Sequence, residues 1–121
     1  MLLVEVLLDS LTKMSVLLDT GASFSTFDST ELLMAGYDLS KPIGFADVET
    51  AIGMLQVEVF ELHEFTAFGI TKKNYRIQVY DFLAHGLLSE HQGILGLDFF
   101  EGTKFCIDTV RNQISIEPLP V

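Results

Sequence analysis

The sequence predicts a mostly β protein, a closed or folded-over sheet of about eight short strands with one or two short helices. Two observations predict this fold class. Several segments alternate apolar and polar residues with the period of two that is typical of strands. Short clusters of Gly, Asn, Asp and Pro separate these segments, as turns between strands require. At 121 residues the chain suits one core, so we expect a single domain over residues 1–121.

The N-terminal part of the chain predicts a β-hairpin. Residues 1–8 form an apolar-rich first strand, and Asp9–Lys13 supply the polar residues of a turn. The second strand is expected over Met14–Leu18, so that it carries Asp19 at its C-terminal end.

Two short helices are expected. In FDSTELLMAG, Asp28 is suited to the N-cap, Glu31 stands three residues later as in a capping box, and Gly36 follows the last turn. In GILGLDFFEG, an apolar loop continues into a second short helix that contains Asp98.

The remaining segments predict strands. MLQVEVFEL and NYRIQVYDF alternate clearly, with Leu55, Val57 and Val59 on one face of the first and Tyr75, Ile77 and Val79 on one face of the second. HEFTAFGITKKN lies between them as a hairpin arm, with its turn expected near Lys72–Asn74. KFCIDTVRNQISIEP predicts a strand, a turn at Val110–Asn112 and a last strand that Pro118 ends.

The charge of the chain excludes some partners. Acidic residues outnumber basic ones 17 to 7, for a net charge of −10. We expect neither nucleic acid nor a membrane as a partner, because phosphate groups are bound by Lys and Arg and no apolar run approaches the ~18 residues of a membrane span. The acidity is most simply explained by solubility. No signal peptide is recognisable, so a cytoplasmic location is expected.

Cysteine and histidine suggest no site. The single cysteine, Cys106, excludes an internal disulfide, and its alternating surroundings predict a small buried apolar residue rather than a nucleophile. The three histidines, His63, His85 and His91, lack the spacing of zinc ligands. We therefore expect neither a metal nor a cofactor.

Asp19 is the most informative residue of the sequence. It follows the apolar pair Leu17–Leu18 in LLDTGASF, and the next residues are Thr20, Gly21, Ala22 and Ser23. Because Asp and Gly both favour turns, Asp-Thr-Gly alone is a weak signal. A second motif, ILGLD, strengthens it: far along the chain stand Ile94, Leu95, Gly96 and Asp98.

Together these motifs resemble the retropepsin-like aspartic proteases, the single-domain relatives of retroviral proteases. The resemblance covers nearly the whole chain: a hairpin, the Asp-Thr-Gly-Ala-Ser run ending at Ser23, a short helix over Ser29 to Gly36, the Ile94–Gly96 stretch and the closing FCIDTVRNQISI. A looser match is the hairpin that resembles the flap of this family. It opens with Thr50, Ala51, Ile52 and Gly53.

The resemblance implies that Asp19 is catalytic and that Thr20, Gly21, Ala22 and Ser23 support it. In this chemistry two carboxylates share a proton across about 3 Å, so that one takes a proton from water while the other gives one to the scissile carbonyl. The chain has one Asp-Thr-Gly, so the second copy must come from a second chain, in a symmetric homodimer. Burial at the dimer interface would also account for the apolar share of 49%.

The sequence departs from the retroviral pattern at two positions. Where those relatives often pair an Asp with a basic residue, this chain has Ser23 and Leu97. The double change is self-consistent, because keeping one partner would leave a lone buried charge. Asp98 is expected to be a hydrogen-bonding group at the start of its helix rather than a second catalytic acid.

Two functions remain open from the sequence. The first is an aspartic endopeptidase whose peptide substrate lies extended under the flaps, with apolar side-chain pockets near Phe24, Ile52, Leu55 and Ile94. The alternative is a catalytically inactive dimerisation or peptide-binding module with the same fold. The intact Asp-Thr-Gly-Ala-Ser favours the enzyme, because a binding module has no need for two carboxylates that repel each other.

Overall fold

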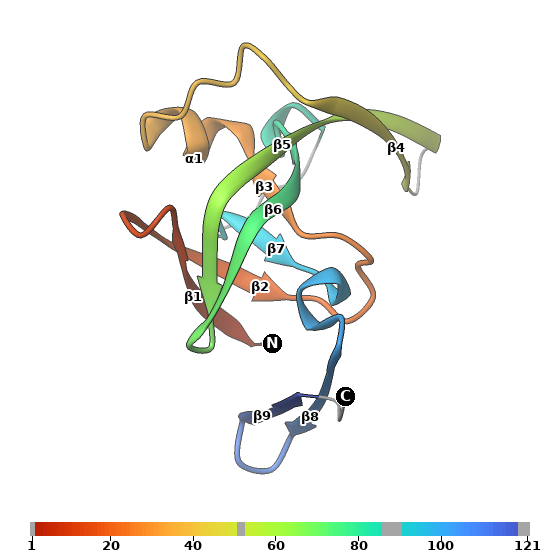
Figure 1. Cartoon of the computed structure of the whole chain (residues 1–121). Helices are drawn as coiled ribbons and strands as arrows, with labels where there is room; N and C mark the ends of the chain where they lie inside the picture. The colour runs from red at the N-terminus through yellow and green to blue at the C-terminus, as the bar shows by residue number, and fades with distance from the viewer. Residues whose placement is uncertain (1, 51–52, 86–90, 119–121) are drawn as a thin grey trace.

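The computed structural model describes residues 2–50, 53–85 and 91–118, and within them the chain is mostly β (Figure 1). Helices are few and short, as the sequence predicts. In chain order the elements are β1 (Leu3–Leu8), β2 (Thr12–Leu18), β3 (Thr26–Asp28), α1 (Ser29–Met34), β4 (Gly44–Thr50), β5 (Gly53–Ala67), β6 (Ile70–Tyr80), the 3-10 helix η1 (Leu83–His85), β7 (Gly93–Leu95), the 3-10 helix η2 (Leu97–Phe100), β8 (Thr103–Asp108) and β9 (Gln113–Pro118).

Six of these strands form a closed ring. Their order is β1-β2-β7-β3-β6-β5, and the ring closes because β1 pairs with β5 as well as with β2. β2 and β7 run parallel, as do β3 and β6, while the other neighbours are antiparallel. Closure pairs the strand edges that an open sheet would leave exposed.

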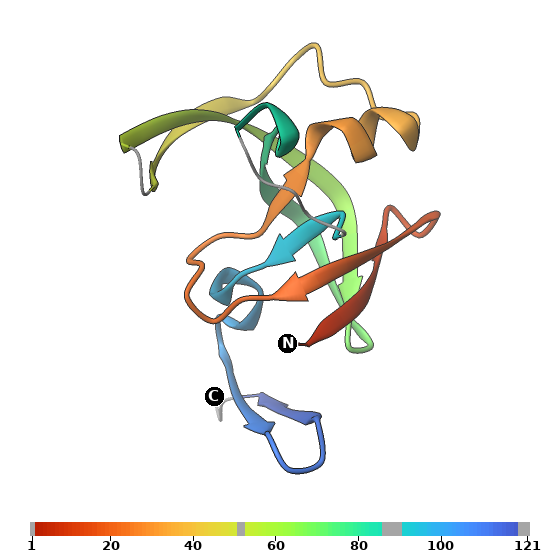
Figure 2. The ribbon, with the colours of Figure 1, turned by 180° about the vertical axis from the view of Figure 1, so that it is seen from behind.

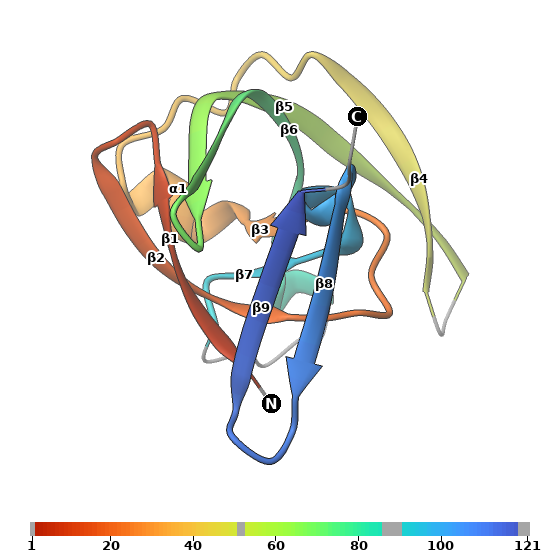
Figure 3. The same cartoon turned by 60° about the horizontal axis from the view of Figure 1, so that its bottom comes forward.

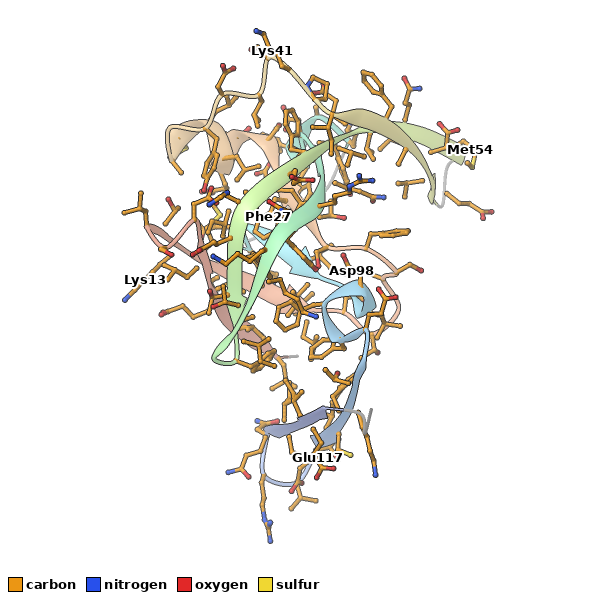
Figure 4. The ribbon with its side chains drawn as sticks, viewed as in Figure 1. Lys13, Phe27, Lys41, Met54, Asp98 and Glu117 are labelled. Carbon is orange, nitrogen blue, oxygen red and sulfur yellow. The ribbon has the colours of Figure 1, made fainter. Side chains whose placement is uncertain are left out.

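The interior of the ring is an apolar core with aromatic rings at its centre. Phe65 is fully buried and lies 6.0 Å from Phe27, 4.7 Å from Tyr75 and 5.7 Å from Phe99, measured between ring centroids. The residues predicted to share one face of β6, namely Tyr75, Ile77 and Val79, are all buried in this core. The side-chain view shows Phe27 inside the ring of strands (Figure 4).

The turn between β5 and β6 lies elsewhere than the sequence predicts. It falls at Phe68–Gly69, whereas the predicted Lys72–Asn74 lies within β6. Phe68 and Gly69 have φ angles of 52° and 75°, which suit a two-residue hairpin turn. The polar Lys residues belong to the strand because cross-strand partners hold them there: Lys73 donates to Glu64 at 2.7 Å.

Helix α1 begins and ends as predicted, but the capping box does not form. The Asp28 carboxylate accepts from the Thr30 N–H at 3.4 Å, and Gly36 follows the helix with φ at 95°. Glu31 instead accepts from the side-chain amide of Gln92 at 3.1 Å. The Asp28 N–H donates to the Gln92 carbonyl at 3.1 Å, so a segment distant in sequence takes the place of the box. In the described ranges no helix combines the length and the apolar character needed to cross a bilayer.

The last two strands, β8 and β9, form a separate two-stranded sheet beyond the ring (Figures 2 and 3). One face of this hairpin packs back on the body of the protein, where Phe105 stacks on Phe100 at 4.2 Å and half-buried Ile114 and Ile116 contact the core. Cys106 points the other way and is exposed, so its predicted burial is wrong. Alternation predicts which residues share a face, but not whether both faces of a strand are covered.

Candidate active site

The ring brings the two sequence motifs together. Asp19 follows the end of β2, whose Leu18 is paired in parallel with Leu95 of β7. The Asp19 N–H donates to the Leu95 carbonyl at 3.1 Å, which continues the pairing by one residue. Segments far apart in the sequence therefore meet at the start of the Asp-Thr-Gly loop. The loop leaves the ring on the side over which the β4–β5 hairpin projects (Figure 1).

The loop after β2 turns tightly around the Asp19 carboxylate. Asp19 Oδ1 accepts the Gly21 N–H at 2.9 Å, and the Asp19 carbonyl accepts the Ala22 N–H at 3.1 Å. A Cβ at position 21 would stand 3.2 Å from Oδ1, closer than almost all such contacts. Thr20, Gly21 and Ser23 are exposed, whereas Ala22 is half-buried. The loop thus fixes the carboxylate and leaves its surroundings open to solvent.

Gly96 packs directly against the same loop. The Leu97 N–H donates to the Ala22 carbonyl at 2.8 Å. A Cβ on Gly96 would lie 2.7 Å from the Phe24 carbonyl carbon and 2.9 Å from the Ala22 carbonyl oxygen, distances that real Cβ atoms do not show. The two backbones can approach this closely only because residue 96 has no side chain.

A buried hydroxyl joins three elements behind the loop. Ser25 is fully buried, and its Oγ donates to Asp98 Oδ1 at 2.9 Å and accepts from the Gly96 N–H at 3.1 Å. Tyr75 OH lies 2.8 Å from the same Oγ, and it must be the donor because Ser25 has given its single hydrogen to Asp98. Burial raises the pKa of Tyr75, with the Asp98 charge adding to the effect, so this phenol stays protonated.

Asp98 lies in the first turn of η2 and makes its hydrogen bond to a side chain of another segment. It lies beside the loop that follows β2 (Figure 4), and its carboxylate bonds Ser25 of the preceding segment rather than a backbone N–H at the start of η2. Sequence reasoning gives neither Ser25 nor Tyr75 a role in the site. A serine after a turn motif carries no distinguishing signal, and the alternation of β6 predicts only that Tyr75 faces the core.

A cleft of about 760 Å³ lies between the loop and the β4–β5 hairpin. Asp19 and Ile94 line it near the loop, and Ala46 and Val48 line it from β4. The face of β6 that is turned away from the core also lines it, with Arg76, Gln78 and Tyr80. Leu95 is buried beside Ile94 and does not reach the cleft.

The predicted flap is only partly within the described residues. Thr50 ends β4, and Gly53 begins β5 with φ at 127°. The two strands pair from Gly44 opposite Val59 to Thr50 opposite Gly53, so they form the expected hairpin. Ala51 and Ile52, at the predicted tip, lie outside the described residues.

Apolar side chains surround the site on its open side. Phe24, which lines the cleft, is 58% exposed, and Leu97, beside Gly96, is 41% exposed. Ser23 and Leu97, the two uncharged positions noted in the sequence, thus lie near solvent. Among residues 2–50, 53–85 and 91–118, no group of three or more His, Cys, Asp or Glu side chains is placed to hold a metal ion.

In this structure a loop of small residues at the end of a ring strand holds a carboxylate, which faces a cleft under a β-hairpin. This combination of fold and site is the one found in aspartic proteases. Comparison with known proteins supports the same class. The family model described as aspartyl protease matches residues 4–99, so the chain belongs to the aspartyl protease family.

The solved structures add the subclass of the fold. A retropepsin-like aspartic protease from Rickettsia conorii superposes with a TM-score of 0.68 at 23% sequence identity, covering 94% of this chain and 79% of that one. The predicted retropepsin-like fold and family are thereby confirmed. No curated protein sequence matches the chain.

The first prediction concerns the Ser25 hydroxyl. In Ser25→Ala, Asp98 loses its donor and the Gly96 N–H loses its acceptor in a buried place, so we expect the free energy of unfolding to fall by about 2 to 3 kcal/mol. Urea denaturation measures this loss. Ser23→Ala is the matched control, because its exposed hydroxyl should contribute less than about 0.5 kcal/mol. Equal small effects in both variants would show that the Ser25 network is not structural.

The second prediction concerns the close approach at Gly96. Gly96→Ala should destabilise the protein by about 1 to 3 kcal/mol or more, because the new methyl group meets backbone atoms that cannot move aside. Gly44→Ala is the control: its Cβ would meet nothing within 4 Å, and its φ is not in the left-handed region. The measurement is the thermal unfolding of both variants, compared with that of the parent protein. A Gly96→Ala protein as stable as Gly44→Ala would contradict the packing described here.

Proposed function

We propose that the protein is an aspartic endopeptidase that works as a homodimer. In this proposal, two Asp19 carboxylates, one from each subunit, face each other and activate a water molecule. The observation that carries the proposal is the placement of Asp19: its loop fixes the carboxylate through Gly21, and the same carboxylate lines the cleft under the flap hairpin.

The chemistry needs both carboxylates in different protonation states. Two carboxylates within hydrogen-bond reach cannot both ionise freely, so the pair holds one proton. The ionised Asp19 takes a proton from the water as it attacks the scissile carbonyl, and the protonated Asp19 gives its proton to the carbonyl oxygen. The Asp19 that took the proton from water then gives it to the leaving nitrogen, and the C–N bond breaks. At the same time the other Asp19 takes a proton from a hydroxyl of the tetrahedral intermediate, so the carboxylic acid product forms and the pair again holds one proton.

A second subunit is needed because this chain does not supply the partner carboxylate. Asp98 is engaged by Ser25 and does not line the cleft. Asp47 and Glu49 line the cleft from β4, but strand alternation turns their side chains to the face opposite Ala46 and Val48. Exposed Phe24 and Leu97 beside the loop also suit an interface between two subunits that each carry a net charge of −10.

The substrate in this proposal is a peptide in extended form. It would lie between the Asp-Thr-Gly loops and the flaps, with its backbone adding strand-like hydrogen bonds. Half-buried Leu55 and Ile94, with exposed Phe24, supply apolar contacts for its side chains. The cytoplasmic location stays a prediction from the sequence.

The third prediction tests this function directly. Asp19→Asn should abolish peptide cleavage, because no other group can replace the lost acid and base, while the dimer stays folded. Its free energy of unfolding should not fall, because the change removes a repulsion between carboxylates and keeps the shape. Asp38→Asn, a change in an exposed carboxylate that does not line the cleft, should keep full activity.

The measurements are sedimentation for mass and cleavage of a peptide library, with and without an inhibitor that mimics the tetrahedral intermediate. Activity should be highest at acidic pH and decline as the shared proton leaves on raising the pH. A dimer that cleaves nothing under any condition would favour the inactive binding module. A monomer at micromolar concentration, or an active Asp19→Asn variant, would refute the catalytic pair.

A further inference from the structure

We propose that Arg76 gives the cleft a preference for peptides with an acidic side chain at one fixed position. This inference rests on the proposed function, in that it takes the cleft to be the peptide-binding groove. It names a determinant of specificity that the Asp-Thr-Gly chemistry does not require.

The strand β6 turns Arg76 toward the cleft. Its alternate residues Tyr75, Ile77 and Val79 are buried in the core, so Arg76 and Gln78 extend from the opposite face. Both residues line the cleft, together with Val59 of the neighbouring strand. Gln78 is paired with Thr26, which also lines the cleft, so this face of β6 continues directly from the segment that follows the catalytic loop.

Arg76 is the one cationic side chain among the described residues that line the cleft. Asp19 is the carboxylate that faces the cleft, while those of Asp47 and Glu49 lie on the other face of β4. The net charge of the chain, −10, surrounds the cleft with a negative field. A substrate carboxylate is therefore disfavoured by the chain as a whole and attracted at one place. A single cation in acidic surroundings selects both the charge of a substrate side chain and its position along the peptide.

The ion pair of Arg76 with Glu61 does not prevent Arg76 from binding a substrate carboxylate. Its Nε lies 3.9 Å from Glu61 Oε2, directly across the β5–β6 pair, and the side chains are 74% and 38% exposed. An ion pair this long and this exposed contributes little, so it leaves the guanidinium available. A substrate carboxylate can instead take two parallel hydrogen bonds from the guanidinium fork, which is the stronger geometry.

A neighbouring hollow does not compete for the same role. It measures about 380 Å³, and it is lined by Lys72, Asp98 and Glu101 as well as by Phe24 and Arg76. Carboxylates and cations are balanced there, and Asp98 is already bonded to Ser25. The charge of Arg76 therefore creates a local excess of positive charge only on its cleft side.

The chain offers a matched control in Arg111. Its Nε also lies 3.9 Å from a carboxylate, that of Asp108, and its side chain is 75% exposed, against 74% for Arg76. Arg111 lies in the turn between β8 and β9 and does not line the cleft. Arg76→Met and Arg111→Met therefore remove the same charge from the same kind of ion pair at two different places.

The experiment measures peptide binding in the Asp19→Asn protein, which cannot turn peptides over. A neutral parent peptide is compared with a series that carries one Glu at each position in turn. At one position Glu should tighten the Kd by about tenfold, or about 1.4 kcal/mol. The gain should fall below about twofold in Arg76→Met and persist in Arg111→Met, and Arg76→Glu should prefer Lys at that position.

The outcomes separate this inference from the proposed function. Parallel cleavage assays use the protein with Asp19 intact: failure to cleave any peptide would defeat the proposed peptidase, while an Arg76-dependent Glu preference in binding would still support the inference. Cleavage of the neutral parent without a Glu preference would overturn the inference alone. So would a Glu preference that survives Arg76→Met, or a failure of every peptide to bind.

Discussion

The contact between the Asp-Thr-Gly loop and Gly96 is the constraint on which the rest of the structure depends. It requires the parallel pairing of β2 with β7, which places Leu18 beside Leu95 and carries the Asp19 N–H to the Leu95 carbonyl. It also requires a residue without a side chain at position 96, because the loop backbone occupies the space that a Cβ would need. The Asp19 carboxylate is therefore positioned by backbone packing between two segments far apart in the sequence, and not by its own loop alone.

The closed ring and the Ser25 network serve this contact in different ways. The ring fixes where β2, β3 and β7 end, because each strand is paired on both sides and cannot shift its register without exposing its apolar face. Ser25 then satisfies the polar groups that the close approach would leave unpaired, since it accepts the Gly96 N–H and bonds Asp98 and Tyr75. Strand β4 lies outside the ring, and within the described residues it is paired on one side, with β5. The protein thus combines a fixed Asp-Thr-Gly loop with a hairpin that has fewer restraints.

Much of this could be predicted from the sequence, because the relevant signals are local. Period-two alternation located the core face of β6, and the two short motifs identified Asp19 and the Ile94–Gly96 stretch. The errors arose where distant residues decide the outcome. Gln92 bonds both Glu31 and the Asp28 N–H, the groups that a capping box would have joined. Cross-strand pairing keeps Lys72 and Lys73 in a strand, while the turn forms at Phe68–Gly69. Cys106 is exposed because, among the described residues, no segment packs on the outer face of this two-stranded hairpin. The link from Ser25 to Tyr75 joins residues 50 positions apart, so local pattern cannot reveal it.

The central claim is that one catalytic centre is built from two copies of Asp19. The most direct test is the stoichiometry of a hydroxyl-containing inhibitor that mimics the tetrahedral intermediate, measured by calorimetric titration and by native mass spectrometry of the complex. A shared centre on the two-fold axis accommodates one inhibitor between two chains, so the account predicts saturation at half a molecule per chain and a complex of two chains with one inhibitor. Saturation at one molecule per chain, or a complex of one chain with one inhibitor, would contradict it.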